Sequence, residues 1–339
     1  MQFSETLLLN RRDVKNLLTI EKCISEVEQA FKSYAKGETP VPGALGIQSV
    51  DGGFHIKAGI MHLGKRYFVA KTNANFPGNN KKFGLPTIQG IMVVCDADNG
   101  KLLALMDSIE ITILRTGAAT AVAAKWLSKE NAKTMTICGS GIQGMISLRA
   151  VLKVRPIEKV FIFDIDEIKA AQFARDLSRE LNISIQPVSH LKEAIGQSDI
   201  CITCTPSKKY FFLKEWLTPG LFIAAIGADN EDKQELEPSV LASCKLITDL
   251  TMQCARFGEL HHAIETGIMK QSGVYGELGE IIACIKPGRI SNEEIIVFDS
   301  TGTALQDIVA AAIVYEKALE GNLGSRLNFS DQVLETAIK

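Results

Sequence analysis

The sequence lacks several features that mark whole classes of protein. Its 37 Lys and Arg residues balance 39 Asp and Glu residues, leaving a formal net charge of −2 and no general positive field for nucleic acid. No uncharged window approaches the roughly 20 residues of a membrane helix, because Glu110, Arg115 and Lys125 interrupt the longest apolar stretches. The opening residues, MQFSETLLLNRRD, lack the charge order of a signal peptide. We therefore expect a cytoplasmic protein with a small ligand and neither a nucleic-acid nor a membrane partner.

Motifs for disulfides and metals are also scarce. The chain has eight cysteines, and Cys201 and Cys204 form its C-x-x-C pair within DICITCTP. That segment alternates like a strand, whereas a redox pair needs a helix start and zinc needs further ligands. His261 and His262 lie beside Glu259, but adjacent residues on a helix point about 100° apart. We expect no disulfide, and no metal site at these residues or elsewhere.

The patterning of the chain indicates two domains. At 339 residues it is long enough for about two. Residues 19–38 place apolar side chains at helical spacing, and residues 40–107 alternate between apolar and polar residues like a mixed sheet. A further helix is expected from about Ser108. From Thr134 onward, short β-branched runs alternate with amphipathic helices, which is typical of a parallel α/β sheet. Those runs are TMTIC, VFIFD, CITCT, LFIAAIG, KLITD and IIVFD.

A glycine-rich turn begins this second region. Gly139, Gly141 and Gly144 directly follow the predicted strand at residues 134–138 and open a predicted helix. A tight structural turn also favours glycine, so the motif alone is weak. However, a second strand ends at Asp164, 20 residues beyond Gly144. In a dinucleotide-binding βαβ unit the glycines admit the pyrophosphate and such an acid binds the ribose hydroxyls. The context therefore predicts a bound dinucleotide.

The acids after the second strand favour NAD over NADP. Asp164 is followed by a second acid at Asp166, with no arginine directly after Asp164. These carboxylates would repel a 2′-phosphate. We therefore predict NAD as the cofactor.

Four charged residues outside the nucleotide unit are candidates for substrate chemistry. Lys57 and Lys71 have apolar neighbours in strand-like segments, so their side chains could face inward, although most lysines face solvent. Arg115 precedes the small-residue run TGAATAVAA, where a planar guanidinium could pair with a carboxylate. Asp229 follows a predicted parallel strand at the sheet edge that binds ligands. Three cations and one acid suggest an anionic substrate.

At these residues the chain resembles the ornithine cyclodeaminase/μ-crystallin superfamily, and most of all its archaeal-type alanine dehydrogenase branch. The resemblance spans nearly the whole length. It rests on collinear blocks: AKTNANFPGN, GLPTIQGIMVV, ALMDSIEITILRTGAATAVAAKWL, GSGIQG, AIGADNEDKQEL, GELGEII and FDSTGTALQDIVAAAIVYEKAL.

The resemblance implies an α/β fold with a Rossmann dinucleotide-binding domain at residues 116–303. Residues 1–115 and 304–339 would form a mixed α+β domain for substrate binding and dimerisation. It further implies that Lys71 and Arg115 hold the substrate carboxylate and that Lys71 and Asp229 are catalytic. The expected cofactor-binding residues are Thr87, Arg115, Thr116, Gly139, Ser140, Gly141, Ile142, Gln143, Gly144, Asp164, Thr205, Ile226, Lys233 and Ser300.

Two departures from the ornithine enzyme concern substrate choice. This chain has no cation near Ala44, where the cyclodeaminase has an arginine for the carboxylate. Lys57 stands where a glutamate would receive the far amino group of ornithine, and it would repel that group. Lys57 could instead replace the missing arginine in binding substrate.

These departures favour an alanine dehydrogenase-like, NAD-dependent oxidoreductase that acts on a small 2-amino or 2-imino acid as a homodimer. The alternatives are a cyclodeaminase that uses NAD catalytically, a ketimine reductase and a non-enzymatic crystallin-like binder. Glu277 and Glu280 match a family block but have no role assigned from sequence beyond capping or orientation.

Overall fold

The computed structural model describes residues 5–328, and the chain divides into two compact units. Unit 1 comprises Met1–Ala30, Gly37–Arg115 and Thr303–Lys339, and unit 2 comprises Phe31–Lys36 and Thr116–Gly302. The parts of the predicted first domain at residues 1–4 and 329–339 lie outside the described residues. Two helices, α2 (Ile20–Ala35) and α4 (Ile109–Leu127), run from one unit into the other.

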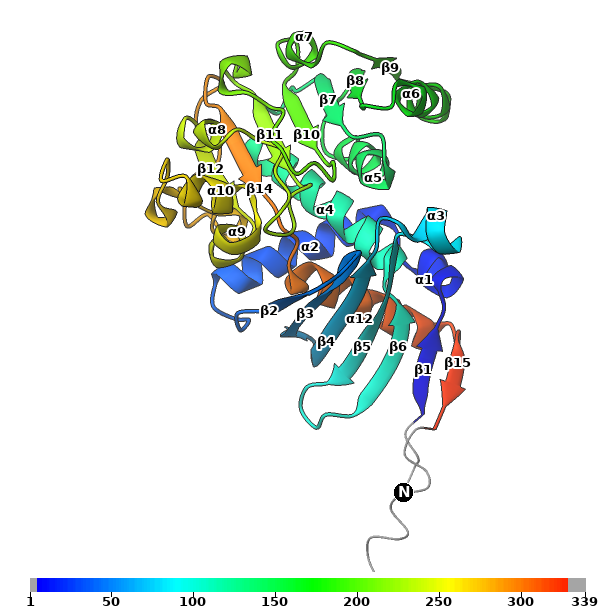
Figure 1. Cartoon of the computed structure of the whole chain (residues 1–339). Coiled ribbons are helices and arrows are strands. Elements are labelled where there is room, and N and C mark those ends of the chain that lie inside the picture. Colours follow the sequence, from blue (N-terminus) through cyan, green and yellow to red (C-terminus); the bar gives the residue numbers. More distant parts are fainter. Residues whose placement is uncertain (1–4, 329–339) are drawn as a thin grey trace, which may run out of the picture. The chain divides into compact units, whose positions relative to one another are not determined.

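Unit 1 is built on a seven-stranded sheet with the order β15-β1-β6-β5-β4-β3-β2 (Figure 1). Neighbouring strands are antiparallel except for β1 and β6, which are parallel. In register, Lys57 of β3 lies directly opposite Lys71 of β4, so both side chains are on one face. The strands are β1 (Thr6–Leu9), β2 (Gly43–Ser49), β3 (Gly52–Leu63), β4 (Lys65–Asn75), β5 (Ile88–Asp96), β6 (Leu102–Asp107) and β15 (Ser325–Leu327).

Helix α12 (Ala304–Glu320) packs on the face of this sheet that carries Lys57 and Lys71. At the closest approach, a Cβ on Gly59 would lie 3.1 Å from the Cδ1 atom of Ile308, so glycine lets the helix approach the strand. Two further helices of this unit are α1 (Arg11–Leu17) and α3 (Asn79–Phe83).

The opposite face of the same sheet carries exposed apolar side chains. They are Leu45, Ile47, Phe54 and Ile91, each 40–50% exposed. We call these four residues the apolar face. Exposed apolar side chains gathered on one face of a sheet are typical of an association surface.

Unit 2 is built on an eight-stranded sheet in which every pairing is parallel, with the order β13-β12-β14-β11-β10-β7-β8-β9. The strand order reverses at β7, which pairs with β8 on one side and β10 on the other. Ligands of open α/β sheets bind at such a switch point, beyond the carboxyl ends of the strands. The strands are β7 (Thr134–Cys138), β8 (Lys159–Phe163), β9 (Ser184–Pro187), β10 (Ile200–Thr203), β11 (Phe222–Ala225), β12 (Lys245–Thr248), β13 (Gly276–Glu277) and β14 (Ile296–Asp299).

Helices pack around the parallel strands, which are buried as near-continuous apolar runs. None of the helices in residues 5–328 has the length and apolar character needed to cross a membrane. The helices of unit 2 are α5 (Ile142–Val151), α6 (Glu167–Leu181), α7 (Leu191–Ile195), α8 (Pro238–Ala242), α9 (Thr251–Phe257), α10 (Glu259–Glu265) and α11 (Leu278–Ile282), with 3-10 turns η1 (Lys214–Trp216) and η2 (Gln271–Gly273).

The α/β fold class predicted from the sequence is confirmed, with one parallel sheet and one mixed sheet. The six β-branched runs all form parallel strands of unit 2. Sequence patterning did not reveal β9, whose segment SIQP is short and mostly exposed, or β13, which has two residues.

Candidate functional site

The glycine turn of unit 2 forms a cradle of exposed backbone at the switch point. Gly139 has φ +109°, which a residue with a Cβ rarely adopts, and its N–H donates to the Phe163 carbonyl at 2.8 Å. A Cβ on Gly144 would collide with the Gly139 carbonyl. A Cβ on Gly141, by contrast, would meet no atom within 4 Å, and Gly141 is the N-cap of α5. The cradle therefore leaves open space where a helix amino terminus offers N–H groups to phosphate.

Asp164 is fixed beside this cradle by Ser140. Its Oδ2 accepts from the Ser140 backbone N–H at 2.8 Å and from Ser140 Oγ at 2.6 Å, and its Oδ1 accepts the Asp166 N–H. Burial disfavours the carboxylate, but these hydrogen bonds outweigh it and lower the pKa of Asp164. Asp166 caps α6 by accepting the Lys169 N–H at 3.2 Å. Asp164 is thus a charged acceptor at the end of β8, where a ribose hydroxyl could bind.

Two neighbours in the same turn differ in exposure. Ile142 is half exposed at the start of α5. The Oε1 atom of Gln143 is buried and has no hydrogen-bond partner among the described residues. A buried acceptor without a donor is costly, and a ligand N–H or hydroxyl could satisfy it.

A buried carboxylate, Glu235, connects the other loops at this sheet edge. Its Oε1 accepts the Thr205 N–H at 2.6 Å and Thr205 Oγ1 at 2.7 Å, and its Oε2 accepts the Gly227 N–H at 3.1 Å. Burial raises the pKa of Glu235. Ile226 directly follows β11, and its N–H donates to the Thr203 carbonyl oxygen at 2.9 Å. Sequence reasoning missed Glu235, because an acid in AIGADNEDKQEL has no periodicity that predicts burial.

Asp229 lies on the loop after β11, beside Lys233. The Lys233 Nζ donates to Asp229 Oδ1 at 2.7 Å, and the Asp229 side chain remains 41% exposed. The attraction of Asp229 outweighs the burial of Lys233 and raises the pKa of that ammonium. His262 Nε2 lies 2.8 Å from the Lys233 carbonyl oxygen and ties the loop to α10. Asp229 is therefore an accessible carboxylate in a fixed loop.

The remaining predicted cofactor residues are divided between the units. In unit 2, Ser300 is buried and donates its Oγ to Asp249 Oδ2 at 3.0 Å. Thr116 is half-buried on α4, and its carbonyl accepts from Thr120 Oγ1. In unit 1, Thr87 is exposed just before β5, and its carbonyl accepts the Phe76 N–H.

Unit 1 brings Lys71 and Arg115 together around one buried carboxylate, Asp307. The Lys71 Nζ donates to Asp307 Oδ1 at 2.7 Å, and the Arg115 Nε lies 3.1 Å from the same oxygen. Arg115 Nη1 also donates to Gln306 Oε1 at 2.7 Å. Each of these side chains is less than a tenth exposed. Lys71 comes from β4, Arg115 from α4, and Gln306 and Asp307 from α12.

The charges in this cluster do not cancel. Burial and the Arg115 charge lower the pKa of Lys71 to about 7, against the opposing attraction of Asp307, and Lys57 acts in the same direction as Arg115. Burial disfavours the Asp307 carboxylate, but Lys71 and Arg115 outweigh that effect and lower its pKa. With Lys71 protonated, the two cations Lys71 and Arg115 share the one carboxylate of Asp307. The cluster can therefore accept a further anion.

Sequence reasoning missed Asp307 and Gln306. It expected a bound substrate carboxylate alone to offset the positive charge of a buried Lys71. Asp307 supplies part of that charge from 236 residues away. The available signal was a charged residue and an amide within the apolar helix segment TALQDIVAAAIV, where solvent-facing residues are few. The Gln306 Nε2 is buried and has no hydrogen-bond partner among the described residues, so it is a donor available to a ligand.

The geometric argument against a shared metal at the histidine pair is wrong. The rings of His261 and His262 lie 5.2 Å apart between centroids, and Glu265 brings a third ligand atom, all within 4.8 Å of one another. Side-chain rotation brings the ring atoms together although the Cα–Cβ directions diverge. Glu277 and Glu280 form a capping box on α11, and Glu277 also accepts the Thr251 N–H at 2.8 Å.

Comparisons with known proteins agree with this geometry. The family model described as ornithine cyclodeaminase/mu-crystallin family matches residues 4–322. The chain is 37% identical to an alanine dehydrogenase of Archaeoglobus fulgidus over 96% of this chain and 99% of that protein. A solved archaeal alanine dehydrogenase dimer with bound NAD superposes with a TM-score of 0.92 at 36% identity, covering 96% of this chain and all of that one. Thermococcus litoralis Δ1-pyrroline-2-carboxylate reductase, solved with NADH and L-proline, gives 0.89 at 32% identity, covering 95% and 100%.

Proposed function

Because this chain belongs to the ornithine cyclodeaminase/mu-crystallin family, we propose that it is an NAD-dependent oxidoreductase that deaminates a small 2-amino acid. The observation that carries the proposal is the buried cluster of unit 1, in which the two cations Lys71 and Arg115 share the carboxylate of Asp307. The uncompensated positive charge suits the carboxylate of an amino or imino acid. Arg115 offers a planar fork for it, and Lys71 a point charge.

The residues of unit 2 fit a dinucleotide. Gly141 leaves space beside the amino terminus of α5, and Asp164 offers a fixed carboxylate for ribose hydroxyls. The buried Gln143 Oε1, which has no hydrogen-bond partner among the described residues, could accept a hydrogen bond from the ligand. A dinucleotide held by these residues would supply the acceptor for a hydride from the substrate Cα, and the substrate would become a 2-imino acid. The carboxylate of Asp164 disfavours a 2′-phosphate, which supports NAD rather than NADP.

Asp229 would be the acid/base. Its carboxylate is oriented by Lys233 at 2.7 Å, yet two-fifths of the side chain is accessible. It would take a proton from the water that attacks the imino carbon, and the resulting carbinolamine would release ammonia and a 2-oxo acid. A protonated Lys71 would stabilise the developing hydroxyl oxygen and fix the substrate carboxylate.

We also propose a homodimer in the cytoplasm. The apolar face of unit 1 lies opposite the α12 side of its sheet, and a second copy of the chain would bury it. All eight cysteines are free thiols, which suits a reducing compartment.

One assay separates this function from its alternatives. The protein is incubated with NAD and single amino acids while NADH and ammonia are both followed. Alanine should give NADH and ammonia in equal amounts. Ornithine converted to ammonia without NADH would instead indicate a cyclodeaminase, and NADH from proline without ammonia would indicate a cyclic-imine reductase. No turnover of any of them would favour a non-enzymatic binder.

The role of Asp229 is tested in the same assay. Asp229→Asn keeps the shape but removes the proton acceptor, so turnover should fall about a hundredfold while NAD still binds. Asp232→Asn is the matched control, since Asp232 lies on the same loop in an exposed ion pair with Lys208. Equal activity of the two variants would remove Asp229 from the mechanism.

A further inference from the structure

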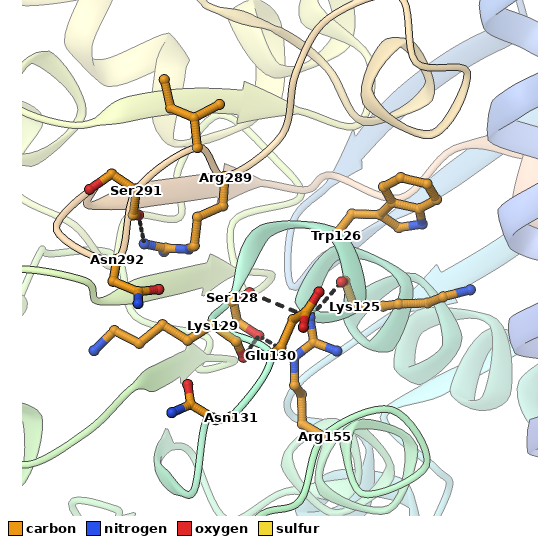
Figure 2. A pocket seen from close by; sticks show the side chains of 11 residues that line it. Lys125, Trp126, Ser128, Lys129, Glu130, Asn131, Arg155, Arg289, Ser291 and Asn292 are labelled. Carbon is orange, nitrogen blue, oxygen red and sulfur yellow. Dashed lines mark hydrogen bonds between the residues drawn. The ribbon is translucent and has the colours of Figure 1, made fainter.

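A pocket in unit 2 lies at the opposite end of the parallel strands from the glycine cradle. It encloses about 680 Å³ and is lined by the last residues of α4, the loop before β7, Arg155 and the loop before β14 (Figure 2). Because β7 has five residues, the pocket and the cradle are separated by roughly 17 Å along the strand. The lining residues are Lys125, Trp126, Ser128, Lys129, Glu130, Asn131, Arg155, Arg289, Ile290, Ser291 and Asn292.

The charge of this pocket is predominantly positive. Four of its lining side chains are cations and Glu130 is its one acid. Lys129 pairs with Asp199 at 3.3 Å. The two arginines have no carboxylate partner within ion-pair distance in the described part of the chain, and their guanidinium groups bond to carbonyls and one hydroxyl instead. Glu130 attracts Arg155 and Glu294 attracts Arg289, in each case without an ion pair among the described residues.

The charge of Arg155 acts on Arg289. Burial lowers the pKa of Arg289 against the opposing attraction of Glu294, and the charge of Arg155 lowers it further. Part of this arrangement stabilises α4, since Arg155 Nη2 donates to the Lys125 carbonyl and Arg289 Nε donates to the Leu127 carbonyl at 2.8 Å. Helix capping does not account for Arg289 Nη2, which is buried and has no hydrogen-bond partner within residues 5–328. An anion oxygen would satisfy that donor.

The size and walls of the pocket indicate the class of ligand. A volume of about 680 Å³ exceeds what a single inorganic anion fills and lies in the range of small-molecule sites. Asn131 and Asn292 add neutral donors and acceptors, and the half-buried Trp126 adds an aromatic ring. We propose that this pocket binds a phosphate-bearing small molecule, with its phosphoryl group on Arg289 and Lys129. The site is independent of the proposed oxidoreductase function.

The experiment uses tryptophan fluorescence of the full chain. The protein has two tryptophans, so Trp216→Phe leaves Trp126 in the pocket as the reporter. Without NAD present, the variant is titrated with inorganic phosphate, a nucleoside monophosphate and citrate. We expect the Trp126 signal to saturate with both phosphate compounds, the nucleotide binding more tightly, and not with citrate. No saturable signal with either phosphate compound, or equal binding of citrate, would overturn the proposal.

Charge variants in the Trp216→Phe background locate the site. Lys129→Gln and Arg289→Lys should each weaken binding about tenfold, and Glu130→Gln should strengthen it. Arg149→Gln, which removes an exposed ion pair with Glu180 elsewhere in unit 2, should leave it unchanged, as should Ser140→Ala in the cradle. Because Arg289→Lys also alters a cap of α4, Lys129→Gln and Glu130→Gln are decisive. If neither changes the affinity, the pocket does not bind the phosphate.

Discussion

Each unit contains a lysine that donates a hydrogen bond to an aspartate at 2.7 Å, but the pKa values of the two lysines are shifted in opposite directions. In unit 1 the pKa of Lys71 is lowered to about 7, whereas in unit 2 the pKa of Lys233 is raised. Lys71 and Asp307 are buried, and Lys71 is also near Arg115 and Lys57. Asp229 is 41% exposed, and no second cation contributes to the shift at Lys233.

The difference shows that an ion pair does not by itself fix the charge of a lysine. Where burial and neighbouring cations outweigh the partner, as at Lys71, the ammonium can release its proton near neutral pH. Where the partner dominates, as at Lys233, the ammonium stays charged and serves to hold the aspartate. The first pair is suited to binding and proton chemistry, and the second to orienting a base.

Substitutions that break the Lys71–Asp307 and Lys233–Asp229 pairs should have the largest effect, because the two pairs differ in burial. Asp307→Asn leaves Lys71 and Arg115 buried without a carboxylate, so the free energy of unfolding should fall by about 3–5 kcal/mol. Lys233→Met breaks the more exposed pair and should cost about 1 kcal/mol or less. Urea denaturation of both variants measures this, and similar losses would show that burial does not distinguish the pairs.

The fold could be predicted from the sequence more fully than the buried cluster around Asp307 in unit 1. Six of the eight parallel strands of unit 2 carry their own β-branched run, and Thr134–Cys138 was predicted to the residue. Asp307 and Glu235 could not be found in that way. Their partners come from other elements, and the apolar pattern of a helix or the polarity of a loop does not say which acid is buried. The glycine turn was predictable because its strand, glycines and acid are local in sequence.

The Arg115 fork is the next test of the unit 1 cluster. Arg115→Lys keeps the charge but removes the planar set of donors that contacts Gln306 and Asp307, so kcat/KM for the best amino acid should fall about 10- to 100-fold. The dissociation constant for NAD, measured by titration, should change much less. Near-normal kcat/KM would mean that Arg115 does not bind the substrate carboxylate.

The opposite pKa shifts of Lys71 and Lys233 predict how substrate binding depends on pH. Lys71 is protonated below about pH 7 and loses its charge above it, while the raised pKa of Lys233 keeps that residue charged throughout. The affinity for a 2-oxo acid, measured with NADH bound, should therefore be level below about pH 7 and fall by up to tenfold per pH unit above it. Lys71→Arg cannot lose its charge, so its affinity should be flat over the same range. A falling affinity in Lys71→Arg would assign the titration to another group.

The smallest expected effect concerns Lys57, which lies opposite Lys71 in the strand register and adds to the positive charge of the cluster. Lys57→Glu exchanges repulsion for attraction toward a distal ammonium, so kcat/KM for ornithine relative to alanine should rise about tenfold. The added carboxylate also opposes binding of any substrate carboxylate, so both absolute values should drop. Lys57→Gln separates these effects, because it removes the repulsion without adding an acid and should shift the ratio by about half as much on a logarithmic scale. An unchanged ratio in both variants would mean that Lys57 acts only on the charge of Lys71 and does not reach the substrate side chain.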